Sequence, residues 1–343
     1  MRSADAKHQV LDRLSRPMRD LRISVIDSCN FRCPYCMPAE VFGDDYSFLR
    51  KEELLTFPEI ARLARIFASF GVVKIKLTGG EPLLRPWLPE LVRMLRTIEG
   101  IEDIGLITNG ALLAGLVQPL RSAGLGRLTV SLDSLDEATF ARLSGRGHRL
   151  AEVLDSIAAA QSGGFPALKL NMVVQRGIND NEVVDMVRRF RHTPHILRFI
   201  EYMDVGNLNG WSRERVVPSR ETLERIAREY PVEPLEPNYR GEVARRYRFL
   251  DGAGEIGFIS SISQPFCGGC TRVRLSADGK LYTCLFARTG TDLKGPLRGG
   301  AGDEEIARIV EEAWTMRRDR YSEDRGTLHS ASGRKIEMFH IGG

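Results

Sequence analysis

The residues of this sequence best suited to chemistry are its six cysteines, which fall into two groups of three. The first group has C-x3-C-x2-C spacing near the N-terminus, and the second has C-x2-C-x13-C spacing near the C-terminus: Cys29, Cys33 and Cys36, then Cys267, Cys270 and Cys284. Disulfides are rare in a reducing cytosol, and they would leave one cysteine of each group unpaired unless the groups were cross-linked. Metal ligation is therefore the expected chemistry.

Iron–sulfur clusters and zinc are the two alternatives for these thiols. Three thiolates on a tight loop can hold three irons of a [4Fe–4S] cube and leave the fourth iron free for a small molecule. A structural zinc site usually has four protein ligands, and no histidine lies near the first loop. The spacing favours iron–sulfur at the first group. At the second group, a zinc site completed by a distant histidine stays open.

Six short apolar runs, rich in β-branched residues, must position the first group. They lie at residues 22–27, 72–77, 104–108, 128–132, 168–174 and 197–202. Segments with helical periodicity separate them, and Pro58 and Pro86 stand where helices would begin. This alternation predicts an α/β protein with a parallel sheet, open or closed into a barrel. In such a barrel the C-terminal ends of the strands converge on one mouth, where chemistry takes place.

Residues suited to ligand contact stand at the C-terminal ends of these runs. The first cysteine loop follows the first run, Gly80 of a Thr-Gly-Gly-Glu-Pro segment follows the second, Ser131 ends the fourth, and Met203 follows the sixth. Glycine lets backbone groups approach a ligand closely, although this segment alone could be a turn. Met203 alone would more often be a core residue.

The pattern changes after residue 217, so we divide the chain into domains at 1–217 and 218–343. We expect a helix capped by Ser219, β-hairpins at 242–262 and 271–284, and a final helix at 303–316. Pairing across the second hairpin is expected to set Cys270 roughly opposite Cys284, within about 5.5 Å.

Bulk composition excludes several classes of protein. The chain is 43% apolar and 27% charged, as ordinary globular proteins are, and its net charge of +4 is too small to indicate nucleic acid as a partner. No stretch approaches the roughly 18 apolar residues of a membrane span, and the N-terminus lacks the apolar core of a signal peptide. We expect a cytoplasmic protein that binds neither nucleic acid nor membranes.

With Tyr35 directly before its third cysteine, the first loop resembles the signature of the radical S-adenosylmethionine (SAM) superfamily. The resemblance implies an incomplete (βα)6 TIM-type barrel whose first three cysteines hold a [4Fe–4S] cluster with SAM on its free iron. One electron from the cluster then cleaves SAM to methionine and a 5′-deoxyadenosyl radical, which abstracts a substrate hydrogen. SAM contacts are implied at Tyr35, Gly80, Ser131 and Met203.

The two cysteine groups and the Gly342-Gly343 terminus together resemble the GTP 3′,8-cyclase family of molybdenum-cofactor biosynthesis. The likeness runs over nearly the whole chain, including Arg-Pro-Met-Arg-Asp-Leu-Arg at 16–22 and Thr-Arg-Val-Arg at 271–274. It implies a C-terminal α+β extension carrying a second [4Fe–4S] cluster that binds guanine, and an active-site role for Gly342 and Gly343. The implied partners are GTP, an external one-electron donor such as flavodoxin or ferredoxin, a downstream cyclic pyranopterin monophosphate synthase and a second copy in a homodimer.

In the implied lyase reaction the radical removes the hydrogen at C3′ of GTP, and C3′ then attacks C8 of guanine. Electron and proton delivery give (8S)-3′,8-cyclo-7,8-dihydroguanosine 5′-triphosphate. GTP carries about four negative charges, which basic side chains must neutralise. Lys74 and Lys76 share one strand face, as do Arg272 and Arg274. The residues implied to line GTP are Arg22, Lys74, Lys76, Lys169, Arg198, Arg272, Val273 and Arg274.

Four positions depart from the family pattern: Ile26, Ser28, Lys76 and Ile107. Lys76 keeps the charge of the usual arginine but loses its bidentate fork, and Ile107 replaces a threonine and cannot hydrogen-bond. These departures leave open a radical SAM enzyme that acts on a different nucleotide or on a peptide. A non-catalytic module with two zinc sites, binding RNA or protein, is a rival of another class and would contain no iron.

Overall fold

The computed structural model describes residues 9–239, 241–325 and 334–343. Within these ranges, twelve strands form one sheet in the order β12-β11-β10-β1-β2-β3-β4-β5-β6-β9-β8-β7. The first six strands pair in parallel, each with the next along the chain. Their bounds are β1 (Asp20–Ser24), β2 (Lys74–Thr78), β3 (Asp103–Thr108), β4 (Arg127–Ser131), β5 (Lys169–Val174) and β6 (Ile196–Glu201).

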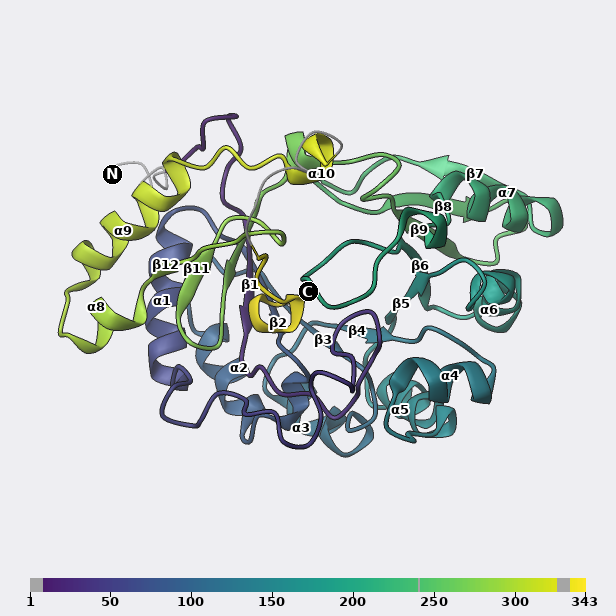
Figure 1. Ribbon diagram of the computed structural model, residues 1–343, viewed down its shortest axis with the longest axis horizontal. Coiled ribbons are helices and arrows are strands. Elements are labelled where there is room, and N and C mark those ends of the chain that lie inside the picture. Colours follow the sequence, from purple (N-terminus) through teal and green to yellow (C-terminus); the bar gives the residue numbers. More distant parts are fainter. Residues whose placement is uncertain (1–8, 240, 326–333) are drawn as a thin grey trace.

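A helix follows each of β1 to β5, and two follow β4, so that helices cover the outer side of the curved sheet (Figure 1). The first helix begins in a capping box, in which the Thr56 hydroxyl accepts the Glu59 amide and the Glu59 carboxylate accepts the Thr56 amide. The helices are α1 (Phe57–Ser69), α2 (Leu88–Arg96), α3 (Val117–Ser122), α4 (Glu137–Ser144), α5 (Leu150–Ser162) and α6 (Val183–Phe190).

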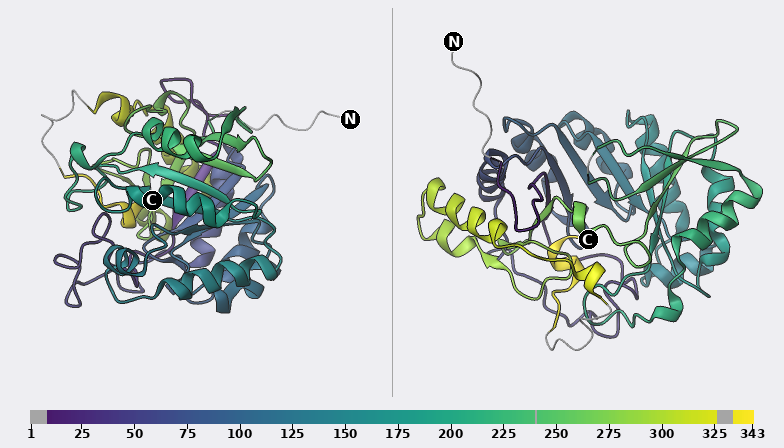
Figure 2. Two further views of the ribbon diagram at one scale, coloured as in Figure 1. Left: turned by 90° about the vertical axis from the view of Figure 1, so that its right-hand side faces the viewer. Right: turned by 90° about the horizontal axis from the view of Figure 1, so that it is seen from above.

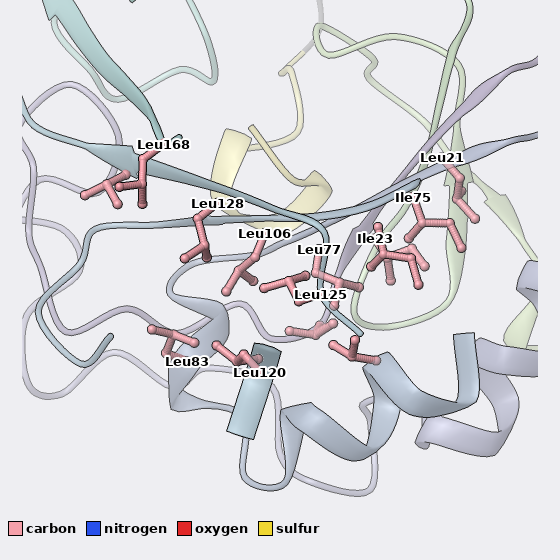
Figure 3. Packing of buried hydrophobic residues seen from close by; sticks show 14 of the residues in the cluster. Leu21, Ile23, Ile75, Leu77, Leu83, Leu106, Leu120, Leu125, Leu128 and Leu168 are labelled. Atoms are coloured by element: carbon pink, nitrogen blue, oxygen red, sulfur yellow. The ribbon is translucent and has the colours of Figure 1, made fainter. Parts of the chain in front are cut away.

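Side-chain alternation along the strands separates the core from the inner face of the sheet. Leu21 and Ile23 of β1, and Ile75 and Leu77 of β2, are buried in the hydrophobic core between the strands and the helices (Figure 3). The residues between them on each strand must then point inward, because successive side chains of a strand face opposite sides. The inner face is therefore where a site can form.

The C-terminal part of the chain extends the sheet at both edges. β10 pairs in parallel with β1, and β9 pairs in parallel with β6. The α/β fold with a partial barrel and a C-terminal α+β part is confirmed, but the predicted domain division stays a prediction because one sheet runs through both parts. The later elements are α7 (Ser219–Glu229), β7 (Val232–Leu235), β8 (Arg245–Phe249), β9 (Glu255–Ile259), β10 (Arg272–Leu275), β11 (Lys280–Tyr282), β12 (Thr291–Asp292), α8 (Lys294–Arg298), α9 (Asp303–Thr315), α10 (Tyr321–Asp324) and α11 (Met338–Ile341).

Two local predictions are wrong. Ser219 is the first residue of α7 and makes no side-chain cap; its backbone amide instead donates to the buried Glu201 carboxylate. The β10–β11 turn is centred one residue later than expected and pairs Arg274 with Tyr282. Continuing that register would set Cys284 opposite Arg272, two residues from Cys270.

Among the described helices, none is long and apolar enough to cross a membrane.

Candidate active site

A cavity of about 350 Å³ lies on the inner side of the sheet and has the size of a small-molecule site. Both cysteine groups line it: Cys29, Cys33, Cys36, Cys267, Cys270 and Cys284. All six are free thiols and half-buried. The fold thus brings the two groups, far apart in sequence, to one cavity.

The two groups lie toward opposite ends of β1. The first group follows the C-terminal end of this strand, whereas Cys267 and Cys270 precede β10, whose Arg272 pairs with Asp20 at the start of β1. Because β1 and β10 are parallel, residues that precede β10 lie toward the N-terminal end of β1. A single molecule that contacts both groups must therefore lie along the inner face of the strands.

The first cysteine loop is fixed by its own backbone and by Arg32. The amides of Cys36 and Met37 donate to the Cys33 carbonyl at 2.9 and 2.8 Å. The buried Arg32 guanidinium donates to the Cys29 carbonyl at 2.6 Å. Burial raises the pKa of Cys29 to about 12, so its thiol stays protonated at neutral pH unless a cation binds.

The donor set of each group fits an iron–sulfur cube. Three thiolates can bind three of its irons and leave the fourth free, whereas a structural zinc site usually has four protein ligands. The Cys29 sulfur also accepts from the Phe31 amide at 3.4 Å, as cluster sulfurs commonly do.

The glycine segment after β2 packs directly against the backbone that leads into this loop. Gly80 donates its amide to the Ile26 carbonyl at 2.8 Å, and Glu81 donates to the Ser28 carbonyl at 2.9 Å. A Cβ on Gly80 would lie 2.2 Å from the Ser28 oxygen, so only glycine allows this approach. Burial raises the pKa of Glu81 to about 7, and its carboxylate accepts from the Asn109 amide after β3.

Replacing Gly80 with alanine is expected to lower the free energy of unfolding by about 2 kcal/mol or more, because the new methyl group collides with backbone that cannot move alone. Gly115→Ala is the matched control, since a Cβ there meets nothing within 4 Å, and it should change stability by less than about 0.5 kcal/mol. Denaturant unfolding of both variants measures the difference. Equal stabilities would contradict this account of the loop.

The residues assigned to SAM lie on this cavity: Tyr35, Gly80, Ser131 and Met203. The Tyr35 hydroxyl donates to one oxygen of Asp133 at 2.6 Å, and the other oxygen of this carboxylate accepts from the Val173 amide at 2.8 Å. Burial raises the pKa of Asp133 to about 6. These contacts fix the Tyr35 ring against Asp133 at the cavity wall.

Seven of the eight residues predicted to line GTP are basic, and all seven line the cavity: Arg22, Lys74, Lys76, Lys169, Arg198, Arg272 and Arg274. The eighth, Val273, is buried in the hydrophobic core, where Leu21 is its partner in the β1–β10 register. Its neighbours on β10 face the cavity, so its own side chain must face away. That Val273 lines GTP stays a prediction, and such a contact would have to come from its backbone, which lies between those of Arg272 and Arg274.

The pKa values of two of these lysines, Lys76 and Lys169, are lowered by burial and by neighbouring arginines. Burial, Arg198 and Arg22 hold the pKa of Lys76 well below its usual value. Burial, Arg198 and Arg127 lower the pKa of Lys169 to about 8. Positive charges that repel one another in a buried site make it suited to a polyanion, which would neutralise them.

The C-terminal residues reach this site. Gly343 lines the cavity, and the Gly342 carbonyl accepts from the Arg274 guanidinium. Gly342 has a φ of 74°, and a Cβ there would lie 2.5 Å from the Thr78 side chain. All views place the C-terminus well inside the outline of the molecule (Figures 1 and 2).

Comparison with known proteins decides the family. Residues 23–190 match the Radical SAM superfamily, and residues 195–323 match Molybdenum Cofactor Synthesis C. A protein of Xanthomonas axonopodis pv. citri named GTP 3′,8-cyclase is 54% identical over 332 residues, which cover 97% of this chain and 98% of that protein. The chain belongs to the GTP 3′,8-cyclase family.

Other relatives and solved structures agree with this assignment. GTP 3′,8-cyclases of Acidothermus cellulolyticus and Staphylococcus saprophyticus are 50% and 48% identical, covering 97% and 98% of this chain and 99% of each relative. The structure of Streptococcus suis SuiB bound to S-adenosylmethionine matches with a TM-score of 0.62 at 14% identity, over 92% of this chain and 69% of SuiB. That likeness supports the fold, and the superfamily implies an iron–sulfur cluster and SAM.

All four departures from the expected pattern have a place in the structure. Ile26 and Ser28 contribute their backbone carbonyls to the glycine segment, a contact that does not depend on side-chain type. Lys76 lies in the basic group, and Ile107 also lines the cavity. Ile107 thus places an apolar side chain on the cavity where the resemblance implied a hydroxyl.

Sequence reasoning missed several cavity residues. Arg127 lines the cavity and shares a strand face with Ser131, so alternation along β4 could have found it. Arg16 donates to the Cys267 carbonyl at 2.8 Å, and Arg317 donates to the Cys270 sulfur at 3.2 Å. No strand pattern marks these two arginines in the sequence, although Arg16 opens the Arg-Pro-Met-Arg-Asp-Leu-Arg motif at 16–22.

Proposed function

We propose that this protein converts GTP to (8S)-3′,8-cyclo-7,8-dihydroguanosine 5′-triphosphate, the first step of molybdenum-cofactor biosynthesis. The observation that carries the proposal is a single cavity with a cysteine group at each end and a group of cations between them. Cys29, Cys33 and Cys36 would hold the cluster that binds SAM. The second group would hold another [4Fe–4S] cluster, with its free iron toward the guanine base.

When bound, the first cluster and SAM supply a 5′-deoxyadenosyl radical that removes the hydrogen at C3′ of the ribose. The chain itself binds and orients the nucleotide. Lys76, Lys169 and Arg198 neutralise the triphosphate, and Arg274 links β10 to the C-terminus. Met338 and Gly343 form part of the cavity wall. Holding the reacting carbons in one geometry provides a large part of the rate enhancement.

The remaining partners follow from the proposed reaction. SAM cleavage consumes an electron, which an external donor such as flavodoxin or ferredoxin would deliver. The cyclised nucleotide is an intermediate, which a cyclic pyranopterin monophosphate synthase would consume. A homodimer stays a prediction.

Metal analysis and a product assay on anaerobically purified protein test the proposal together. About eight irons per chain are expected, four for each cube, and incubation with GTP, SAM and dithionite should give the cyclised nucleotide. Two zinc ions without iron would refute the proposal. Formation of 5′-deoxyadenosine only with another nucleotide or a peptide would favour the alternative substrate.

The pKa of Lys169 predicts a pH dependence. This pKa is about 8 in the folded protein, below the usual lysine value, so the unfolded chain holds this proton to higher pH. In the nucleotide-free protein, the free energy of unfolding therefore rises as pH increases above about 8. This gain is lost as pH falls back through about 8. Bound triphosphate favours the charged lysine and should reverse the trend, stabilising the protein more at pH 7 than at pH 9.5.

Thermal unfolding with and without inorganic triphosphate measures this effect across the pH range. Lys169→Met is the control, and it should flatten the part of the profile that lies above pH 8. An unchanged profile in this variant would show that another group carries the dependence.

A further inference from the structure

We propose that the loop of residues 203–209 after β6, here the clamp loop, holds the C-terminal tail, residues 334–343, in the cavity. Asn207 and Asp204 are its positioning residues. The inference rests on the proposed function only for the consequence of tail docking on catalysis. The contacts that make the clamp stand on the structure alone.

Asn207 binds the tail as a neighbouring strand would. Its side-chain nitrogen donates to the Lys335 carbonyl at 2.6 Å, and its side-chain oxygen accepts the Lys335 amide at 2.9 Å. The Glu337 carboxylate accepts from both the backbone amide and the side chain of Asn207, at 3.1 and 2.8 Å. One asparagine thus makes four hydrogen bonds to two tail residues.

Gly206 makes room for this arrangement. Its φ is 64°, in the left-handed region that side chains rarely adopt. A Cβ at this position would lie 2.0 Å from a Glu337 carboxylate oxygen. The clamp loop therefore has glycine where both its own turn and the approach of the tail require it.

Asp204 ties the tail to the body of the protein through a buried carboxylate. It is 8% exposed, and it accepts from the Lys335 ammonium at 2.9 Å, from the Arg325 guanidinium at 2.9 Å and from the Tyr321 hydroxyl. The Lys335 ammonium also donates to the Asp204 carbonyl at 2.6 Å. Hydrogen bonds to a charged group are stronger than neutral ones, so this is the firmer of the two anchors.

The tail is also held beyond the clamp. His340 lies 3.1 Å from the Asp278 carboxylate, and Arg274 binds the Gly342 carbonyl. The clamp loop itself begins at Met203, which lines the cavity. One short loop therefore contacts the cavity with its first residue and fixes the tail with its later ones, so loss of the clamp should lower the fraction of time that Gly343 spends in the cavity.

The test uses Asn207→Asp in the reconstituted holoenzyme. The new carboxylate faces the Lys335 carbonyl and Glu337, removing two hydrogen bonds and adding repulsion. Amide hydrogen exchange of residues 334–343 should become about tenfold faster, since these losses amount to about 1.4 kcal/mol or more. Asn207 is exposed, so global thermal stability should hardly change. The turnover number for cyclised GTP should fall by a similar factor, with more 5′-deoxyadenosine formed per product and an unchanged KM for SAM.

Two further variants make the result specific. Asn181→Asp adds the same charge at an exposed asparagine of the 3-10 helix Asp180–Glu182 and should leave exchange and turnover unchanged. Combining Asn207→Asp with Glu337→Gln supplies a new donor to the carboxylate and should restore part of the protection.

If the tail amides of Asn207→Asp exchanged at the wild-type rate, the proposal of a clamp would be wrong, even if turnover had fallen. The exchange readout does not depend on the substrate. If the wild-type enzyme makes no cyclised GTP, the proposed function fails while tail exchange still decides whether the clamp exists.

Discussion

Replacing Cys270 with alanine is expected to abolish formation of the cyclised nucleotide while reductive cleavage of SAM continues. The reason is the separation of the two cysteine groups toward opposite ends of β1. If each group holds a cube as proposed, the variant should keep about four of eight irons, because only the second cube is lost. Iron content, 5′-deoxyadenosine and the cyclised product, measured in one anaerobic preparation, give the three readouts.

The matched variant Cys33→Ala, in the first group, should lose both 5′-deoxyadenosine and product. Cys270→Ala also removes a hydrogen-bond acceptor from Arg272 and Arg317, which both donate to the Cys270 sulfur. Cys284→Ala is therefore a second variant that disrupts the same group and leaves these two contacts in place. Cys284→Ala should reproduce the Cys270 result. Cyclised product from either second-group variant would mean that the second group is not needed for this reaction.

Replacing Lys76 with methionine should make the nucleotide-free protein more stable and its GTP binding much weaker. Desolvation, Arg198 and Arg22 hold the pKa of Lys76 well below its usual value, so its charge is unfavourable until an anion arrives. Losing one charged partner of a buried ion pair costs about 2–5 kcal/mol, which is a loss of roughly 30-fold or more in affinity. Thermal unfolding and equilibrium binding of GTP measure the two opposite effects.

Lys76→Arg is the control, since it keeps the charge and supplies the bidentate donor that the resemblance implied at this position. It should bind GTP at least as tightly as the wild type. If Lys76→Met destabilised the nucleotide-free protein, the lysine would have a structural partner, and the repulsion argument would be wrong.

The sequence was sufficient for features that depend on local pattern. The β-branched runs predicted the six parallel strands, because a buried strand must have such residues whatever it pairs with. The C-terminal ends of parallel strands converge in such a barrel. Gly80, Ser131 and Met203, which stand at these ends, accordingly lie on the cavity that the first cysteine loop lines. Alternation along β10 likewise explains why Arg272 and Arg274 line the cavity while the Val273 side chain packs in the core.

Features that depend on pairing between distant segments were not predictable. Nothing in residues 255–275 shows that β9 and β10 join opposite edges of one sheet. Arg16 and Arg317 reach the second cysteine group from segments without strand pattern, through contacts with residues far along the chain. Asn207 is an ordinary exposed loop residue until the tail lies beside it.

The pairing of β10 with β1 and of β9 with β6 has a consequence for synthesis of the chain. Until these late strands emerge from the ribosome, both outer strands of the nascent parallel sheet present unpaired backbone groups, which are templates for aggregation. A product truncated after β6 should therefore need chaperones or precipitate. If metal binds the first cysteine loop during translation, it does so while the outer strands β1 and β6 are still unpaired.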